Sequence, residues 1–142
     1  MPVPIIALAI LVAGATPPIP PVFAPTHLPP TIVAALQRVV TQPKPRYPVQ
    51  NVVSPDDYPA AAKGRGTVGM DLLTDKNGGV ADCWITQSSG SWQLDAGTCN
   101  VVKRRARFTP ALDRDGNPTL GKIAVQVDWE NVFRRTRSVR AN

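Results

Sequence analysis

Histidine and cysteine are scarce in this sequence, which limits the metal and redox chemistry that it could support. The 142 residues include one histidine, His27, and two cysteines, Cys83 and Cys99. A structural zinc site usually takes four Cys or His ligands, so this set argues against a metal site, and no motif calls for a cofactor. In an oxidising compartment, two cysteines are instead expected to form a disulfide.

A long apolar run is also missing. The longest, Ile5–Ala15, has eleven residues, whereas a membrane-spanning helix needs about 20. Its length suits the apolar core of a secretory signal with an Ala13-Gly14-Ala15 cleavage site, although no Lys or Arg precedes it. We therefore predict that residues 1–15 are a signal peptide or a short membrane anchor, either of which places the remainder outside the cytoplasm. The further alternatives are neither of these, or a chain start assigned too far downstream.

Proline divides the remaining chain. Twelve of the 16 prolines lie between Pro17 and Pro59, and proline-rich backbone is extended and poor in N–H donors. Residues 16–53 are therefore predicted to be an extended linker. A short helix at 31–41 is the exception, because apolar residues recur there at helical spacing.

Positive charge is concentrated at the other end. The entire net charge of +6 lies in residues 101–142, and residues 131–142 are predicted to form a basic tail. Such a tail could bind an anionic membrane or cell-wall surface, or it could simply be solvated. Aromatic residues are not interleaved with its arginines, which argues against a nucleic-acid partner.

Residues 54–130 have the periodicities of a folded domain. Thr67–Asp75 and Lys122–Trp129 alternate apolar and polar residues, as half-buried strands do. A further strand at 80–87 can place Val80 and Cys83 on one face only with a bulge, so its register stays open. Trp92–Phe108 has helical periodicity and stops at Pro110, and a shorter helix with an aspartate cap is predicted at 56–64.

This order of elements predicts an α+β fold, with one small three-stranded antiparallel sheet and two helices on one face. The last strand is expected at the edge of the sheet, where its backbone groups are unpaired. Because the long helix must pack over the sheet, Cys83 and Cys99 are expected to form a disulfide that stabilises the domain by about 3 kcal/mol.

The same part of the chain resembles the TonB C-terminal domain family over about 75 residues. The resemblance rests on the order and spacing of several short motifs and on the cysteine pair, which is similar to that of a two-cysteine subgroup. The matching segments are Asp57-Tyr58-Pro59-Ala60-Ala61-Ala62, Gly66-Thr67-Val68, Asp75-Lys76-Asn77-Gly78-Gly79-Val80, Asp82-Cys83, Ser88-Ser89-Gly90, Leu94-Asp95, Cys99 and Arg107-Phe108-Thr109-Pro110-Ala111.

The resemblance implies a periplasmic protein of a Gram-negative bacterium that binds a peptide segment of an outer-membrane transporter. In that family the segment adds as a strand beside the last strand of the domain. Here the docking strand would be Lys122, Ile123, Ala124, Val125, Gln126, Val127, Asp128 and Trp129, with Tyr58 and Pro59 as family-motif residues. The family also implies coupling to a proton-driven motor complex in the inner membrane.

Two features leave an alternative open. Ile5–Ala15 is shorter than the anchor of a full energy transducer and lacks the polar residue that such anchors carry. The alternative is a secreted TonB-like binding domain that transduces no force.

The sequence does not predict an enzyme. Ser88, Ser89, Asp95 and His27 include the residue types of a hydrolase triad. His27, however, lies between the prolines of the predicted linker, where nothing would hold it beside a serine.

Overall fold

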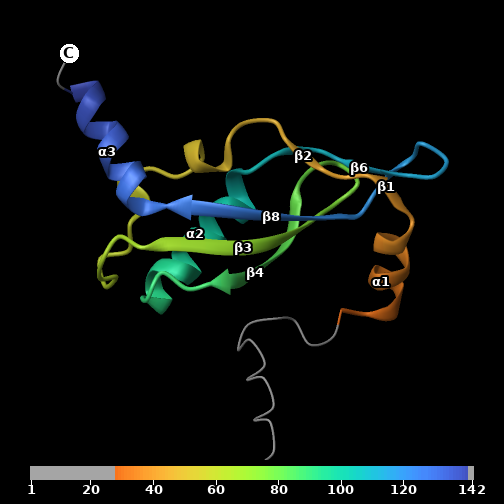
Figure 1. Cartoon of the computed structure of the whole chain (residues 1–142), viewed down its shortest axis with the longest axis horizontal. Helices are drawn as coiled ribbons and strands as arrows, with labels where there is room; N and C mark the ends of the chain where they lie inside the picture. Colours follow the sequence, from red (N-terminus) through yellow and green to blue (C-terminus); the bar gives the residue numbers. More distant parts are fainter. Residues whose placement is uncertain (1–27, 141–142) are drawn as a thin grey trace, which may run out of the picture.

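The computed structural model describes residues 28–140, so the predicted signal peptide or anchor, His27 and the start of the predicted linker lie outside the described residues. A three-stranded antiparallel sheet in the order β4–β3–β8 forms the centre of the fold (Figure 1). Its strands are β3 (Thr67–Thr74), β4 (Val80–Gln87) and β8 (Gly121–Asp128). The predicted α+β class, with its three-stranded antiparallel sheet, is confirmed.

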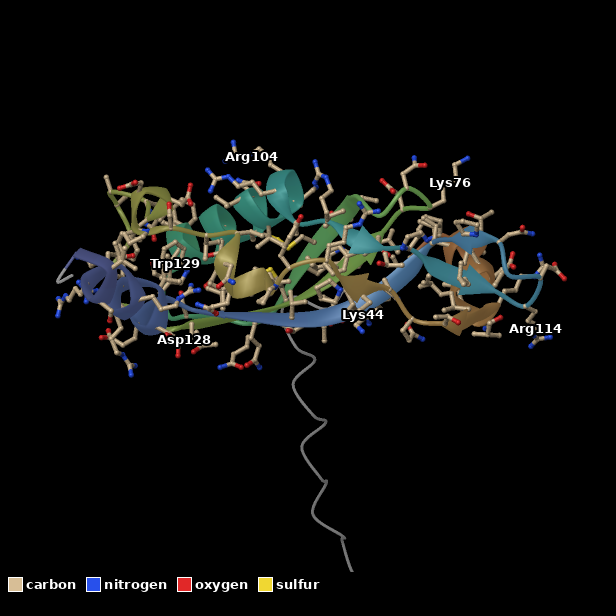
Figure 2. All side chains as sticks on the ribbon, turned by 90° about the horizontal axis from the view of Figure 1, so that it is seen from above. Lys44, Lys76, Arg104, Arg114, Asp128 and Trp129 are labelled. Carbon is tan, nitrogen blue, oxygen red and sulfur yellow. A yellow bond between two sulfur atoms is a disulfide. The ribbon has the colours of Figure 1, made fainter. Side chains whose placement is uncertain are left out.

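One long helix, α2 (Trp92–Arg105), covers one face of this sheet. Figure 2 shows the sheet and α2 as two layers, with the chain around residues 45–55 between them at the side of β8. Alternate residues of β3, such as Val68, Met70 and Leu72, point into this core and are fully buried. Among residues 28–140, every helix is too short or too polar to cross a membrane.

The second strand contains a bulge. Leu73 pairs with Asp82 but Thr74 pairs with Val80, so Ala81 is the extra residue. The bulge lets Val80 and Cys83 both pack against the core. The structure thereby gives the register that the sequence leaves open.

The predicted disulfide is also present. Cys83 on β4 is bonded to Cys99 on α2, with the two Cα atoms 6.0 Å apart. It joins the outer strand of the sheet to the helix that covers it.

Both predicted helix boundaries in the domain need correction. α2 ends at Arg105 and not at Phe108, because Phe108 is fully buried and its N–H donates to the Gly78 carbonyl at 2.8 Å. The segment predicted as a helix at 56–64 forms only one 3-10 turn, η2 (Pro55–Asp57). Tyr58 leaves that turn with extended backbone, because its ring packs against Trp129 at a centroid distance of 5.5 Å.

The predicted linker is shorter than its proline content suggests. The short helix predicted at 31–41 is present as α1 (Pro30–Gln37), but it ends four residues early because residues 39–41 form a strand, and it buries no residue. Beyond it, β1 (Val39–Thr41) pairs with β6 (Ala111–Asp113), and β2 (Lys44–Pro45) pairs with β5 (Phe108–Thr109). The 3-10 turn η1 (Val49–Asn51) follows, and Val49 and Val53 enter the core. Residues 39–53 are therefore part of the folded body.

The C-terminal boundary also moves outward. Residues predicted as a basic tail form helix α3 (Trp129–Arg140), and Val132 is buried in the core. Trp129, predicted as the last strand residue, is the first residue of this helix. The Asp128 carboxylate accepts the Asn131 N–H at 3.1 Å and so begins the helix. Further along the chain from β5, a turn joins β6 to β7 (Pro118–Thr119), and the two strands pair.

Candidate docking edge

Strand β8 lies at one edge of the central sheet. It pairs with β3 from Thr67↔Asp128 to Thr74↔Gly121, and no strand within residues 28–140 pairs with its other side. An edge strand presents N–H and C=O groups that a further strand can bind. The expectation that the last strand lies at an edge is therefore met, and Figure 2 looks down on this edge.

The two edges of the sheet differ in regularity. β4, at the opposite edge, has irregular register with β3 at Gly69/Met70 and again at Leu73/Thr74. β8 pairs with β3 at eight consecutive positions without a shift. Bulges twist an edge and interrupt its row of backbone groups. Of the two, β8 is therefore the better template for an added strand.

The contacts of Asp128 show which backbone groups face outward. Its N–H donates to the Gln50 Oε1 at 3.0 Å, and its carbonyl accepts from the Gln50 Nε2 at 2.8 Å. Both groups of Asp128 therefore point away from β3. Because a strand repeats every two residues, the backbone groups of Lys122, Ala124 and Gln126 point to the same side.

Side chains along β8 divide as predicted between the two faces of the sheet. Lys122, Ala124 and Gln126 are exposed, whereas Val127 is fully buried. Ile123 and Val125, the remaining inward residues, are partly buried against the core.

Two side chains on the exposed face of β8 are engaged, one in an ion pair and one in a helix cap. Lys122 forms an ion pair of 2.7 Å with Asp71 on β3, and the Asp128 side chain caps α3. Only Ala124 and Gln126 therefore present unengaged side chains beside the free backbone groups.

An aromatic cluster around the fully buried Trp129 anchors the end of β8. Trp129 is fully buried, and its Nε1–H donates to the Thr98 hydroxyl of α2 at 2.9 Å. Tyr58 packs edge-on against both Trp129 and Phe133, with ring centroids 5.5 Å apart in each case. In Figure 2, Trp129 points between the layers while Asp128 lies at the sheet side. The backbone of the strand end is thereby held in place.

The two family-motif residues have structural roles beside this edge. Tyr58 belongs to the aromatic cluster, and the Pro59 ring lies so close to Gly97 of α2 that a Cβ there would be 2.7 Å from the proline Cγ. Tyr58 and Pro59 therefore fasten the start of the domain to α2 and α3.

An ion pair holds the turn that precedes Tyr58 and Pro59. Asp57 binds the Arg105 guanidinium with both oxygens, at 2.7 and 2.9 Å, and accepts the Ser54 N–H and hydroxyl. Burial of the Asp57 carboxylate raises its pKa, but the hydrogen bonds from Arg105 and Ser54 outweigh burial and hold that pKa below its ordinary value. Asp57 thus stays ionised at neutral pH and ties η2 to α2.

The serines weighed as catalytic residues have a different partner. The hydroxyls of Ser88 and Ser89 both donate to the Asp95 carboxylate, which also accepts the Ser89 N–H at 2.9 Å. Asp95 is nearly buried in the first turn of α2. These residues connect the β4–α2 loop to the helix, and His27 lies outside the described residues. In the part that the structure describes, no three His, Cys, Asp or Glu side chains gather as a metal site would require.

The fold and this edge define a small α+β domain suited to binding an extended segment, and comparison with known proteins gives its family. The family model for the Gram-negative bacterial TonB protein C-terminal matches residues 54–130. The chain therefore belongs to the TonB C-terminal family, a non-enzymatic family associated with transport in the Gram-negative envelope. No curated protein and no solved structure matches the chain.

Proposed function

We propose that this protein binds periplasm-facing segments of TonB-dependent outer-membrane transporters by strand addition along β8. The regular edge of β8 carries the proposal, because it offers outward N–H and C=O groups at Lys122, Ala124 and Gln126 without a bulge. Backbone pairing supplies affinity in this mode, and alternate side chains supply selectivity. Family membership supports transporters as the class of partner.

Proline on the edge should abolish binding while the domain stays folded. In Ala124→Pro and Gln126→Pro the lost N–H faces the free edge, so no bond to β3 is removed. We expect no measurable affinity for either variant. The measurement is fluorescence anisotropy with overlapping synthetic peptides that cover the periplasmic segment of a TonB-dependent transporter of the same bacterium.

Matched controls separate the backbone from the side chain. Ala124→Ser and Gln126→Thr alter the same side chains but keep the N–H, and they should bind within about threefold of wild type. Circular dichroism should show equal folding for all four variants. Unchanged peptide affinity in both proline variants would exclude strand addition at β8.

We further propose that the bound transporter receives energy from the inner membrane, through a proton-driven motor complex that contacts the N-terminal part of the chain. Family membership and the possibility that residues 1–15 are a membrane anchor support this role. The alternative is a released periplasmic binding domain, supported by the shortness of Ile5–Ala15.

The two versions predict different N-termini in the cell. Force transduction requires residues 1–15 to remain on a chain found in the membrane pellet. Release requires a chain that begins near Thr16 in the periplasmic fraction. Intact-mass spectrometry of both fractions distinguishes them, and a chain wholly of the released form would exclude direct coupling.

Helix α3 supports an additional contact with an anionic surface of the envelope, either membrane or cell wall. Its side chains at Arg134 and Arg137 are exposed, Val139 is 80% exposed, and the helix has one acidic residue, Glu130. Such a helix attracts anionic groups through charge and buries an apolar side chain among them.

A further inference from the structure

The Gln50 side chain occupies the last hydrogen-bonding position on the edge of β8. Its amide accepts the Asp128 N–H and donates to the Asp128 carbonyl. A residue of an adjacent strand would make the same pair of bonds. Within residues 28–140, Gln50 is the group that bonds to the outward side of β8, and it comes from 78 residues earlier in the chain.

The structure holds this amide firmly in place. The Arg135 guanidinium donates to the Gln50 backbone carbonyl at 2.6 Å and also to the Asn51 side chain. The neighbouring Val49 is buried in the core. Gln50 therefore meets Asp128 from a turn whose backbone is fixed by Arg135 on one side and by the buried Val49 on the other.

We infer that Gln50 is an end stop that sets the length and register of the partner strand. The partner pairs with the backbone groups of Lys122, Ala124 and Gln126 and ends before Asp128. Its paired core is an extended stretch of about five residues, or about 17 Å. A longer partner gains nothing at that end unless it displaces Gln50. This inference rests on the strand addition proposed above.

Amide hydrogen exchange on the full-length chain tests the end stop without any partner. In wild type, the Asp128 N–H should be protected although it lies on the sheet edge, whereas those of Lys122, Ala124 and Gln126 exchange rapidly. Gln50→Ala should lower the protection factor of the Asp128 N–H by at least about tenfold, because that N–H loses its hydrogen bond. Gln42→Ala, a matched change at an exposed position of the same segment, should leave it unchanged.

A peptide-length series then tests what the end stop does. The probes are the five-residue core of a transporter peptide that binds wild type and two eight-residue versions, one extended at each end. Gln50→Ala should raise the affinity about fivefold for the peptide that is extended beyond Gln126 toward Asp128. This is the gain expected when the N–H and C=O of Asp128 become free to bind the peptide. The affinity of the core and of the other version should not change.

Each result has one meaning. Unchanged protection of Asp128 in Gln50→Ala would overturn the end stop itself. If Asp128 loses its protection but Gln50→Ala changes the affinity for all three peptides by the same factor, Gln50 does not set the register. Failure of every transporter peptide to bind either protein, with the exchange result intact, would instead refute the proposed function and the end-stop role with it.

Discussion

Replacement of Trp129 by alanine should lower the free energy of unfolding by about 4 kcal/mol, as is typical for a large aromatic side chain deleted from a core. The indole is fully buried, packs on Tyr58 and Phe133, and donates to the Thr98 hydroxyl. The change leaves a cavity where β8, α2 and α3 meet. Urea unfolding followed by far-ultraviolet circular dichroism measures the loss.

Trp92 provides a control of the same residue type. It is 74% exposed at the start of α2, so Trp92→Ala should change stability by no more than about 0.5 kcal/mol. Trp129→Phe should fall between the two, because it keeps part of the packing but loses the bond to Thr98. Equal stability of Trp92→Ala and Trp129→Ala would contradict the position assigned to Trp129.

Removal of the disulfide should cost about 3 kcal/mol, because the bond closes a loop with a sequence separation of 16 residues. A domain of this size has only about 5–15 kcal/mol of net stability. The double variant Cys83→Ser/Cys99→Ser, unfolded with urea beside the oxidised wild type, gives the difference.

Two controls accompany that measurement: chemical reduction of the wild type, and the peptide affinity of the double variant. A reductant should bring wild type close to the double variant and should not affect the variant itself. The disulfide lies at β4 and α2, away from β8, so the folded fraction of the double variant should bind transporter peptides as wild type does. A difference in stability below about 0.5 kcal/mol would show that the bond adds little.

Local periodicity was sufficient for most of the central sheet. Alternation located β3 and β8. The conflicting parity of Val80 and Cys83 left the register of β4 open, and the structure resolves it with a bulge at Ala81. Alternation did not show where β8 ends. Trp129 continues the inward pattern of Val127, but its backbone already belongs to α3, since Asp128 caps that helix.

Proline content was misleading for residues 39–53. Pro43, Pro45 and Pro48 suggest an unpacked linker, yet Pro45 lies in the short strand β2 and Pro43 is itself buried. The signal that could have corrected this is the cluster Val49, Val52 and Val53, which packs on the core. The high proline content of the whole segment concealed that three of the five residues at 49–53 are valines.

The contact between Gln50 and Asp128 had no local signal at all. The two residues are 78 positions apart, and neither periodicity nor turn chemistry relates them. The edge strand of the candidate site was predictable because its pattern is local. The group that limits its free length was not, because its place depends on how the N-terminal segment packs.

If the protein transduces force as proposed, the link between Cys83 and Cys99 has a mechanical consequence. If a pull on the chain unravels part of the domain, the residues between the two cysteines stay looped and cannot extend. The sequence separation of 16 corresponds to about 55 Å of extended chain. The partly unfolded chain is therefore shorter, by about that length, than it would be without the disulfide. A pulling force would then reach its other end after less extension.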